Sequence, residues 1–535
     1  MAAIQIADVS KHFNHIVALS SIDATIEAGR LTGLVGPDGA GKTTLLRMLA
    51  ALMAPTSGRI SVAGVDVVED VALVHERTGY MPQRFGLYED LSVIENLRLY
   101  ADLRGVGRAS EKSENGDGRE DMFERLLGFT QLDPFKRRLA GRLSGGMKQK
   151  LGLACALMGH PDVLLLDEPS VGVDPVSRRE LWKMVGELTG DGMAVVWSTA
   201  YLDEAERCED VLLLNSGRLE FAGKPSALTR RLNQRSFRIR NVAGDRRRVL
   251  AETLNQPDVC DGVIQGESVR AVLRDGADSN ALERIAAEHG GLLEQVAPRF
   301  EDAFIDLLGG GPGGRSAIAE KMPTVTLAGE MPVACRNLTK RFGQFVATDN
   351  VTFDVRRGEI FGLLGPNGAG KSTTFKMLCG LLKPSSGEAR VEGHNLRYAP
   401  GKAKLEIGYM AQKFSLYGLL SVRQNLEFFA GVYGLSGTMR REHIREMVET
   451  FELEQYLDAS PDQLPLGFKQ RLALSCALMH RPPVLFLDEP TSGVDPVTRR
   501  EFWTHINGLV QRGVTVLVTT HFMDEAEYCD RVALM

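Results

Sequence analysis

The sequence predicts an α/β protein made of two copies of one domain, with a small α+β domain between them. Long stretches recur: "GLVGPDGAGKTTLLRML" at 33–49 returns as "GLLGPNGAGKSTTFKML" at 362–378, so Lys371 lies 329 residues after Lys42. In each copy an apolar run leads into a glycine-rich loop, and a later apolar run ends in two acids. Buried apolar strands with polar residues at their carboxyl ends indicate a parallel sheet covered on both faces.

Composition and charge exclude several classes of protein. The chain has 535 residues and a net charge of −6, which argues against a coat for nucleic acid or for an anionic membrane. No run reaches the roughly 18 apolar residues of a membrane helix. The N-terminus lacks the pattern of a signal peptide, so any membrane role is expected to come through a partner. The seven cysteines contain no C-x-x-C and are expected to be packing residues.

The repeat defines the domain boundaries. The copies occupy residues 1–230 and 331–535, and the offset between them falls from 329 residues at the lysines to 321 at the acids. The first copy therefore carries about eight extra residues, which we place in the polar stretch "GRASEKSENGDG" at 107–118. It also continues with "SGRLEFAGKPSAL", a predicted closing hairpin, whereas the second copy stops at "DRVALM", which we interpret as a C-terminal truncation.

Residues 231–308 are predicted to form the small α+β domain. Strands are expected at "SFRIR", "VCDGVIQG", "SVRAVLRD" and "LLEQVAP", and helices at "RRVLAETLN", "NALERIAAEHG" and "FEDAFIDLL". Residues 231–330 hold 13 lysines and arginines against 15 acids, so the segment is not basic. Residues 309–330 open with "GGGPGGRSA" and are interpreted as a flexible linker.

Both glycine-rich loops match G-x-x-x-x-G-K-[ST], with a strand before and a helix after. Converging backbone N–H groups and the helix N-terminus suit the phosphates of ATP, the lysines reach the β- and γ-phosphates, and Thr43 and Ser372 would ligate Mg²⁺. The expected nucleotide-binding residues are Gly36, Pro37, Asp38, Gly39, Ala40, Gly41, Lys42, Thr43 and Thr44, and Gly365, Pro366, Asn367, Gly368, Ala369, Gly370, Lys371, Ser372 and Thr373.

The acid pairs complete a hydrolytic site. "VLLLDEPS" places Asp167 and Glu168, and "VLFLDEPT" places Asp488 and Glu489, at the ends of apolar runs. The aspartates are expected in the Mg²⁺ shell, and the glutamates are expected to polarise the attacking water.

At this point the residues resemble ATP-binding cassette (ABC) ATPases over both copies. The resemblance identifies Gln83 and Gln412 with the glutamine loop and with the metal shell, and "LSGGM" with the family signature, Ser144, Gly145 and Gly146. It identifies Asp174 and Asp495 with the D-loop, and Phe13 and Phe342 with the aromatic residue that stacks on adenine. The alternative for each phenylalanine is a buried aromatic position in the hydrophobic core.

The middle segment resembles the accessory domain that follows the ATPase in ABC-2 type exporters. The whole chain resembles a fused two-cassette ATPase whose membrane subunits are separate chains. The resemblance therefore implies permease partners, a peripheral position on the cytoplasmic face of the membrane, and drug efflux.

The family pairs two cassettes head to tail, so that each ATP lies between one phosphate loop and the other signature. The second signature reads "LPLGFKQR", in which Pro465 removes a hydroxyl and an N–H donor and Leu466 removes clearance. It would face the copy that has Asp38 instead of Asn and Ala200 instead of the switch histidine, His521. For Asp38 a side chain turned to solvent is an equal alternative. All these losses fall in one site, whereas the other keeps Gln412, Glu489 and His521 as its catalytic residues.

The sequence thus predicts a transport ATPase with one hydrolytic site and one site that holds MgATP. A soluble two-cassette factor acting on ribosomes or nucleic acid is the main alternative. That class is expected to join its cassettes by a basic helical arm and to keep both signatures, and we expect no nucleic-acid partner here. A nucleotide-dependent scaffold without turnover is opposed by the intact Glu489 and His521.

Overall fold

The computed structural model describes residues 2–83, 86–106, 118–326, 329–412 and 415–535. The chain divides into two compact units, which are Met1–Arg231 with Arg299–Leu308, and Leu232–Pro298 with Gly309–Met535. The polar stretch at 107–118 lies outside the described residues except for Gly118. None of the described helices combines the length and apolar composition needed to span a bilayer. All seven cysteines are described, and they are buried and form no disulfide.

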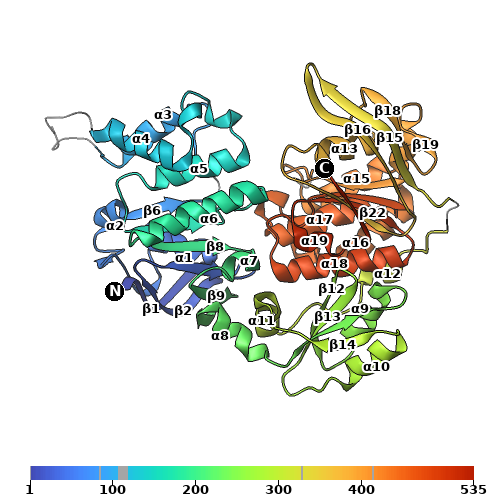
Figure 1. Ribbon diagram of the computed structural model, residues 1–535, viewed down its shortest axis with the longest axis horizontal. Helices are drawn as coiled ribbons and strands as arrows, with labels where there is room; N and C mark the ends of the chain where they lie inside the picture. The colour runs from blue at the N-terminus through green and yellow to red at the C-terminus, as the bar shows by residue number, and fades with distance from the viewer. Residues whose placement is uncertain (1, 84–85, 107–117, 327–328, 413–414) are drawn as a thin grey trace. The chain divides into compact units, whose positions relative to one another are not determined.

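The first unit holds the first copy (blue to green in Figure 1), built on two sheets. The central sheet has the order β10-β9-β3-β8-β7-β6 and is parallel except for the β9–β10 hairpin, and the β2-β1-β4-β5 sheet is antiparallel. The strands are β1 (Ala2–Phe13), β2 (Ile16–Glu27), β3 (Leu31–Val35), β4 (Ser57–Val62), β5 (Val65–Asp66), β6 (Thr78–Met81), β7 (Val163–Asp167), β8 (Ala194–Thr199), β9 (Asp210–Asn215) and β10 (Arg218–Gly223).

Helices lie around these sheets and also form a separate helical part, in which α3 and α4 pack on α5. The helices of the unit are α1 (Lys42–Leu49), α2 (Val71–Arg77), α3 (Val93–Leu103), α4 (Gly118–Thr130), α5 (Gly145–Ala156), α6 (Pro175–Gly190), α7 (Leu202–Ala205), α8 (Pro225–Thr229) and α11 (Phe300–Leu307). The strands β3, β7 and β8 are buried at every position. Continuous apolar runs of this kind are what a sheet covered on both faces requires.

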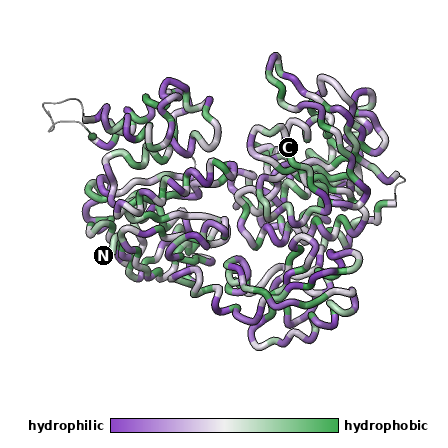
Figure 2. Tube along the Cα trace, viewed as in Figure 1, coloured by the Kyte–Doolittle hydropathy of each residue, from purple (hydrophilic) through white to green (hydrophobic). Residues whose placement is uncertain are grey.

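The second copy repeats this design. Its parallel sheet has the order β20-β21-β22-β17-β23, and its antiparallel sheet has the order β16-β15-β18-β19. The strands are β15 (Val333–Phe342), β16 (Phe345–Val355), β17 (Ile360–Leu364), β18 (Ser386–Val391), β19 (His394–Asn395), β20 (Ile407–Met410), β21 (Val484–Asp488), β22 (Thr515–Thr520) and β23 (Arg531–Leu534). The helices are α13 (Lys371–Leu378), α14 (Pro400–Leu405), α15 (Val422–Val432), α16 (Gly437–Thr450), α17 (Leu466–Leu478), α18 (Pro496–Gln511) and α19 (Met523–Ala526). The hydropathy trace is mostly apolar along the central strands (Figure 2).

Residues 232–298, the middle domain, form an antiparallel sheet of order β12-β13-β11-β14. Its elements are β11 (Ser236–Arg240), α9 (Arg246–Leu254), β12 (Val259–Gln265), β13 (Ser268–Leu273), α10 (Asn280–Glu288) and β14 (Leu292–Gln295). Helix α9 packs on β12 and β13, and α10 packs on β14. These elements lie on the segments for which the sequence predicts them.

Two segments differ from the sequence-based interpretation. Helix α11 belongs to the first unit, where it packs on α7 and α8, because its apolar Phe300, Phe304 and Ile305 become buried there. Within the segment interpreted as a linker, α12 (Ala317–Lys321) packs on α18 in the second unit. A Cβ at Gly508 of α18 would lie 2.7 Å from the Cβ of Ser316, so the close approach requires glycine.

Candidate functional site

The glycine-rich loops have nearly the same geometry in both copies. Each links a buried strand, β3 or β17, to a helix whose N-cap glycine, Gly41 or Gly370, has φ near +100°. The lysine that follows folds back over its own loop: Lys42 Nζ donates to the carbonyls of residues 36 and 37 at 2.7 and 3.1 Å, and Lys371 Nζ donates to those of residues 365 and 366 at the same distances. Both ammonium groups are therefore held beside the loop, where phosphates would lie.

A hydroxyl and an aspartate meet next to each lysine. Thr43 Oγ1 lies 3.3 Å from Asp167 Oδ1, and Ser372 Oγ lies 3.3 Å from Asp488 Oδ1. Burial raises the pKa of both aspartates, because an ionised carboxylate loses its water. Asp167 Oδ2 is buried and has no hydrogen-bond partner among the described residues. Oxygen donors in this arrangement suit a hard cation such as Mg²⁺.

The second acid of each pair faces the loop and its glutamine. Gln83 Nε2 donates to Glu168 Oε2 at 2.6 Å, and Gln412 Nε2 donates to Glu489 Oε2 at 2.7 Å. The lysines lie 3.9 and 4.0 Å from these two carboxylates. Glu168 and Glu489 have φ of 50° and 48°, a left-handed backbone that non-glycine residues adopt mainly where function or tight packing demands it.

The copies differ in what touches that glutamate. In the second copy His521 Nδ1 lies 3.3 Å from Glu489 Oε2. His521 is buried, and its Nε2 has no hydrogen-bond partner among the described residues. In the first copy the same position holds Ala200, a buried methyl group. The imidazole is therefore a neighbour that Glu489 has and Glu168 lacks.

This difference moves the two glutamate pKa values in opposite directions. Burial raises the pKa of Glu168 to about 7 against the opposing charge of Lys42, and the nearby carboxylates of Asp38 and Asp167 contribute to the rise. Burial also tends to raise the pKa of Glu489, but the contact with His521, together with Lys371 and Gln412, outweighs it and lowers the pKa. Before nucleotide binds, Glu489 is an ionised base at neutral pH, whereas Glu168 is partly protonated.

A cavity of about 410 Å³ opens in front of the second loop. Its walls include Phe345 and Ala347 of β16, Asn367, Lys371, Gln412 and Glu489. Sequence reasoning selected Phe342 for the adenine, yet the cavity wall contains Phe345, its cross-strand partner. The hairpin sequence "FGQF" contains both aromatic residues, so the sequence already offered Phe345 as a second candidate for the adenine contact.

Phe342 and Phe13 are 51% and 41% exposed, which excludes the core alternative. Each ring instead lies under a lysine of its own strand, Lys340 at 5.0 Å and Lys11 at 5.3 Å from the ring centroid. In the first copy the cross-strand partner of Phe13 is Ile16, an aliphatic residue. An aromatic wall at this hairpin position is thus a property of the second copy.

The signature regions are the N-termini of α5 and α17. Ser144 caps α5 by accepting a hydrogen bond from the Met147 N–H at 3.3 Å, whereas Pro465 occupies the N-cap of α17 and has no side-chain hydrogen bond. Ser144 and Gly145 are exposed, as is Pro465, while Leu466 is partly buried. The substitutions in the second copy therefore change the surface that this helix end presents.

The glycine that both copies keep is buried and has a packing role. A Cβ at Gly146 would lie 2.5 Å from Ser177 Oγ, and a Cβ at Gly467 would lie 3.1 Å from Thr498 Cγ2. Those two partners follow the N-cap aspartates of α6 and α18, Asp174 and Asp495, and donate to them. Helix docking needs the second glycine, so docking is preserved where the exposed residues have changed. Ser144, Gly145 and Gly146 belong to the first unit and the residues around Lys371 to the second.

Two segments of the chain match a known protein family. Residues 19–171 and 348–492 match the ABC transporter family. The chain is 59% identical over 519 residues to the probable multidrug ABC transporter ATP-binding protein YbhF of Escherichia coli (strain K12), covering 97% of this chain and 88% of that protein. The Nod factor export ATP-binding protein I of Burkholderia orbicola (strain AU 1054) is 41% identical over 205 residues, covering 38% of this chain and 67% of that protein.

One solved structure matches along almost the whole chain. In the crystal structure of the complex of archaeal ribosomal stalk protein aP1 and archaeal ribosome recycling factor aABCE1, one chain superposes with a TM-score of 0.58 at 19% identity, over 98% of this chain and 87% of that chain. At this identity the likeness shows the fold alone. It confirms the predicted α/β fold with two cassettes.

Proposed function

This chain belongs to the ABC transporter family and is an ABC transporter ATPase, and from that premise we propose that it drives an ABC-2 type exporter with one hydrolytic and one ATP-holding site. The two matched segments and the full-length relative confirm the predicted family and the predicted tandem of cassettes. The proposal concerns what the two copies do with ATP, which partners they drive, and where the chain works.

ATP is the substrate of the family, and the residues of both loops fit Mg²⁺ as its companion. Ser372 and Asp488 would hold the metal in the second copy with Gln412, and Thr43 and Asp167 would hold it in the first copy with Gln83. Mg²⁺, when bound, neutralises charge on the phosphate oxygens. Lys371, which is held beside the loop, would add a positive charge near the same oxygens, and N–H groups at the start of the following helix would donate to them.

In the proposed mechanism, hydrolysis depends on Glu489 and His521. The ionised carboxylate of Glu489 accepts a proton from water at Oε1 or Oε2 as that water attacks the γ-phosphorus. The bond from this phosphorus to the β,γ-bridging oxygen breaks at the same time, and ADP leaves with the bond's electron pair. His521 Nδ1 holds this carboxylate at 3.3 Å, which leaves Nε2 to contact a γ-phosphate oxygen. Gln412 donates to the same oxygen, Glu489 Oε2, and so adds a second contact that orients the carboxylate.

The first copy supports binding without this chemistry. Lys42, Thr43 and Asp167 keep the distances of their counterparts, so the loop can hold MgATP. Glu168 has Ala200 in place of the histidine, so the position that holds an imidazole in the second copy offers its carboxylate only a methyl group. In the head-to-tail pairing that the family implies, this loop also faces Pro465 and Leu466.

One observation carries the proposal: two phosphate loops of matching geometry stand beside glutamates of which Glu489 has His521 at 3.3 Å, whereas Glu168 has Ala200 at the same position. Random decay would spread defects over the loops and over both sites. Here the phosphate-binding groups are kept in both copies, and the changes gather around one base.

Steady-state ATPase assays with the membrane partner test the asymmetry. Glu489→Gln removes the base of the hydrolytic site and should lower turnover by about 10²–10⁴-fold. Glu168→Gln is its matched control in the other copy and should leave most of the turnover. Equal losses in the two variants would contradict the asymmetry.

Exposed apolar residues near the glutamine loops support a membrane partner in each copy. Tyr88 and Leu103 in the first copy, and Tyr417 and Leu419 in the second, are about half or more exposed. A cavity of about 720 Å³ in the first copy is walled in part by Tyr100, Leu103 and Leu52. We propose that permease helices dock here, which would hold the chain at the cytoplasmic face of the membrane. Phe85 and Phe414 of the same stretches lie outside the described residues.

YbhF is described as a probable multidrug ABC transporter ATP-binding protein, and this description supports drugs as the class of exported substrate. Co-purification from a detergent extract tests the partner. Recovery with integral membrane subunits of the ABC-2 type is the expected result. Recovery only with ribosomes would favour the alternative of a soluble factor, which the antiparallel, mildly acidic middle segment does not favour.

A further inference from the structure

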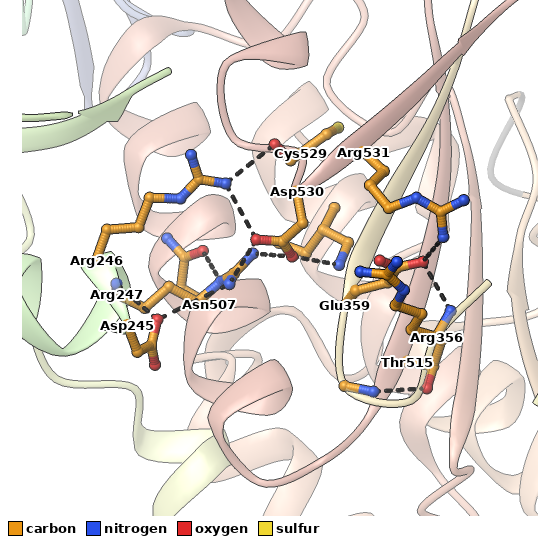
Figure 3. Close-up of polar contacts among 12 residues, drawn as sticks. Asp245, Arg246, Arg247, Arg356, Glu359, Asn507, Thr515, Cys529, Asp530 and Arg531 are labelled. Atoms are coloured by element: carbon orange, nitrogen blue, oxygen red, sulfur yellow. Dashed lines mark hydrogen bonds and ion pairs between the residues drawn. The ribbon is translucent and has the colours of Figure 1, made fainter. Parts of the chain in front are cut away.

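Helix α9 of the middle domain places two consecutive arginines against the second copy. Arg246 and Arg247 begin this helix, are 9% and 7% exposed, and converge on Asp530 (Figure 3). Arg247 binds it with both terminal nitrogens, at 3.0 and 2.6 Å, while Arg246 Nη2 reaches Asp530 Oδ1 at 3.0 Å and the Cys529 carbonyl at 3.2 Å. Bidentate, charge-assisted contacts of this kind are the strongest polar contacts that proteins form.

Asp530 connects that pair to the ATP site. Its Oδ2 also accepts the N–H of Ile360 at 2.8 Å, and Ile360 is the first residue of β17, the strand that leads into the phosphate loop at Gly365. Asp530 itself follows α19, the short helix after His521. One carboxylate therefore ties the segment after the switch histidine to the strand before the phosphate loop.

A second buried contact grips the same segment. Asp261 of β12 lies 3.3 Å from Arg500 of α18, and Arg500 donates to Tyr528 Oη at 3.0 Å. Tyr528 stacks on Trp503 with ring centroids 4.5 Å apart. Arg247 Nε also donates to Asn507 of α18 at 3.2 Å. The middle domain thus contacts both the helix capped by Asp495 and the residues that follow His521.

At the equivalent position of the first copy, the contacts seen among the described residues are made within that copy. There Glu209 Oε2 accepts the N–H of Leu31, the first residue of β3, at 3.3 Å. The next residue, Asp210, pairs with Arg30 of the same copy at 2.8 Å. Where the second copy stacks Tyr528 on Trp503, the first has Arg207 over Trp182. The arginine pair is thus an added support for the copy in which the histidine is kept.

We propose that the middle domain is a positioning element of the second ATP site, in which Arg246 and Arg247 hold Asp530 and thereby keep His521 in register with Glu489. These arginines do not touch nucleotide; they act through the segment 528–530. The proposal rests on the proposed function only in taking hydrolysis at the second copy as the reaction that is positioned.

The test uses the full-length chain with Glu168→Gln as background, so that the remaining hydrolysis comes from the second copy whatever the first can do. Single-turnover hydrolysis of labelled ATP by excess chain gives the chemical rate, and binding of the same ATP gives Kd. Arg247→Ala should lower the rate by about twofold to thirtyfold, the range of a remote coupling of 0.5–2 kcal/mol, and change Kd much less. Arg247→Lys keeps the positive charge but cannot bind the carboxylate with two parallel N–H groups, so its rate should fall less than that of Arg247→Ala.

Arg248→Ala is the matched control. Arg248 is the next residue of the same helix, its side chain is 72% exposed, and it pairs with Glu252 on α9 itself. This variant should keep the rate. If Arg247→Ala fails to fold, Asp530→Asn decides, because the amide oxygen can still accept the Ile360 N–H while the charge that binds the arginines is lost.

A double-mutant cycle separates positioning from a general loss of structure. If Arg247 acts through His521, adding Arg247→Ala to His521→Ala should lower the rate no further than His521→Ala alone. Losses that multiply in the double variant would overturn the proposal. So would an Arg247→Ala or Asp530→Asn variant that folds and keeps the full rate, or one in which Kd weakens as much as the rate falls. Equal effects of Glu168→Gln and Glu489→Gln would instead count against the asymmetry alone.

Discussion

The two ATP sites share a scaffold, and their clearest difference lies around the second acid of each acid pair. The lysine-to-carbonyl distances are equal in both copies, and the hydroxyl–aspartate and glutamine–glutamate distances agree within 0.1 Å. What changes is the surroundings of a single carboxylate, which has His521 in one copy and Ala200 in the other. The comparison teaches that phosphate binding and water activation are separable in this fold, because different groups perform them.

The ends of the middle segment show a parallel contrast. In the first unit the apolar helix α11 packs on α7, the helix after Ala200. In the second unit an arginine pair binds Asp530, four residues after the end of α19. The region after the switch position is therefore supported in both copies, by apolar burial in one and by buried ion pairs in the other. Only the second kind of support has the directionality to fix a side chain in place.

The largest expected effect comes from exchanging the switch residues. His521→Ala removes the neighbour of Glu489 and a γ-phosphate contact, so turnover should fall about 10²–10³-fold. Steady-state ATPase of the full chain with its partner measures this. Ala200→His is the reciprocal change and should raise turnover little, because Pro465 and Leu466 remain. A rise as large as the His521→Ala loss would show that one residue makes the whole difference.

Next comes the pH dependence of stability without nucleotide. The pKa of Glu168 rises from 4.5 to about 7 on folding, so the folded chain binds the extra proton and this group lowers the free energy of unfolding as pH rises across that window. Glu168→Gln removes this pH-dependent fall in the free energy of unfolding. The variant should therefore be more stable than the parent chain at pH 8, by on the order of 3 kcal/mol at most. Thermal unfolding from pH 5 to 8 measures it.

Glu489 serves as a control, because its pKa shift on folding has the opposite sign. Its pKa is lowered on folding, so its charge stabilises the fold above pH 4.5, and that contribution is lost as pH falls through the lowered value. Glu489→Gln should therefore destabilise the chain between pH 5 and 8. Two variants that respond to pH in the same direction would contradict the assigned difference between the carboxylates.

The buried glycines give a smaller effect. Gly146→Ala places a Cβ 2.5 Å from Ser177 Oγ, a hydroxyl already held by Asp174, and should cost about 1–3 kcal/mol as overpacking. Gly467→Ala meets Thr498 at 3.1 Å and should cost less. Unfolding midpoints compare the two variants, and adding Ser177→Gly should recover part of the first loss. A larger loss at Gly467 would contradict the packing argument.

Restoring the second signature should have the smallest effect. Pro465→Ser with Leu466→Gly alters residues at an exposed helix end, so stability should stay within about 0.5 kcal/mol. Turnover should change less than about twofold, since the first copy still lacks a histidine and keeps Asp38. The same ATPase assay measures this. A rise of tenfold would show that the signature alone silences the site.

Short contiguous patterns were enough for most of the site. A strand, a glycine-rich loop and a helix are neighbours in sequence, so the backbone that holds Lys42 or Lys371 could be predicted from a dozen residues. The acid pairs were readable for the same reason, because an apolar run that ends in carboxylates predicts where a buried strand emerges. The repeat then allowed each position to be compared with its counterpart.

Choices between neighbouring residues were beyond such patterns. "FGQF" offers two aromatic residues, and only the hairpin geometry puts Phe345 rather than Phe342 at the cavity wall. "LSGGM" offers two glycines, and only helix packing distinguishes Gly146, which has no room for a side chain, from exposed Gly145. The apolar sequence of α11 was equally consistent with a helix of the middle domain, and only its packing assigns it to the first unit.

By itself, then, the sequence determined the fold class, the two phosphate loops, the acid pairs and the family, because these depend on residues that are close together along the chain. Tertiary structure decided the protonation of Glu168 and Glu489 and the union of Arg247 with Asp530, which are 283 residues apart. The physical reason is that a pKa depends on burial and on charges a few ångströms away. Both are set by contacts between distant segments, which no local pattern records.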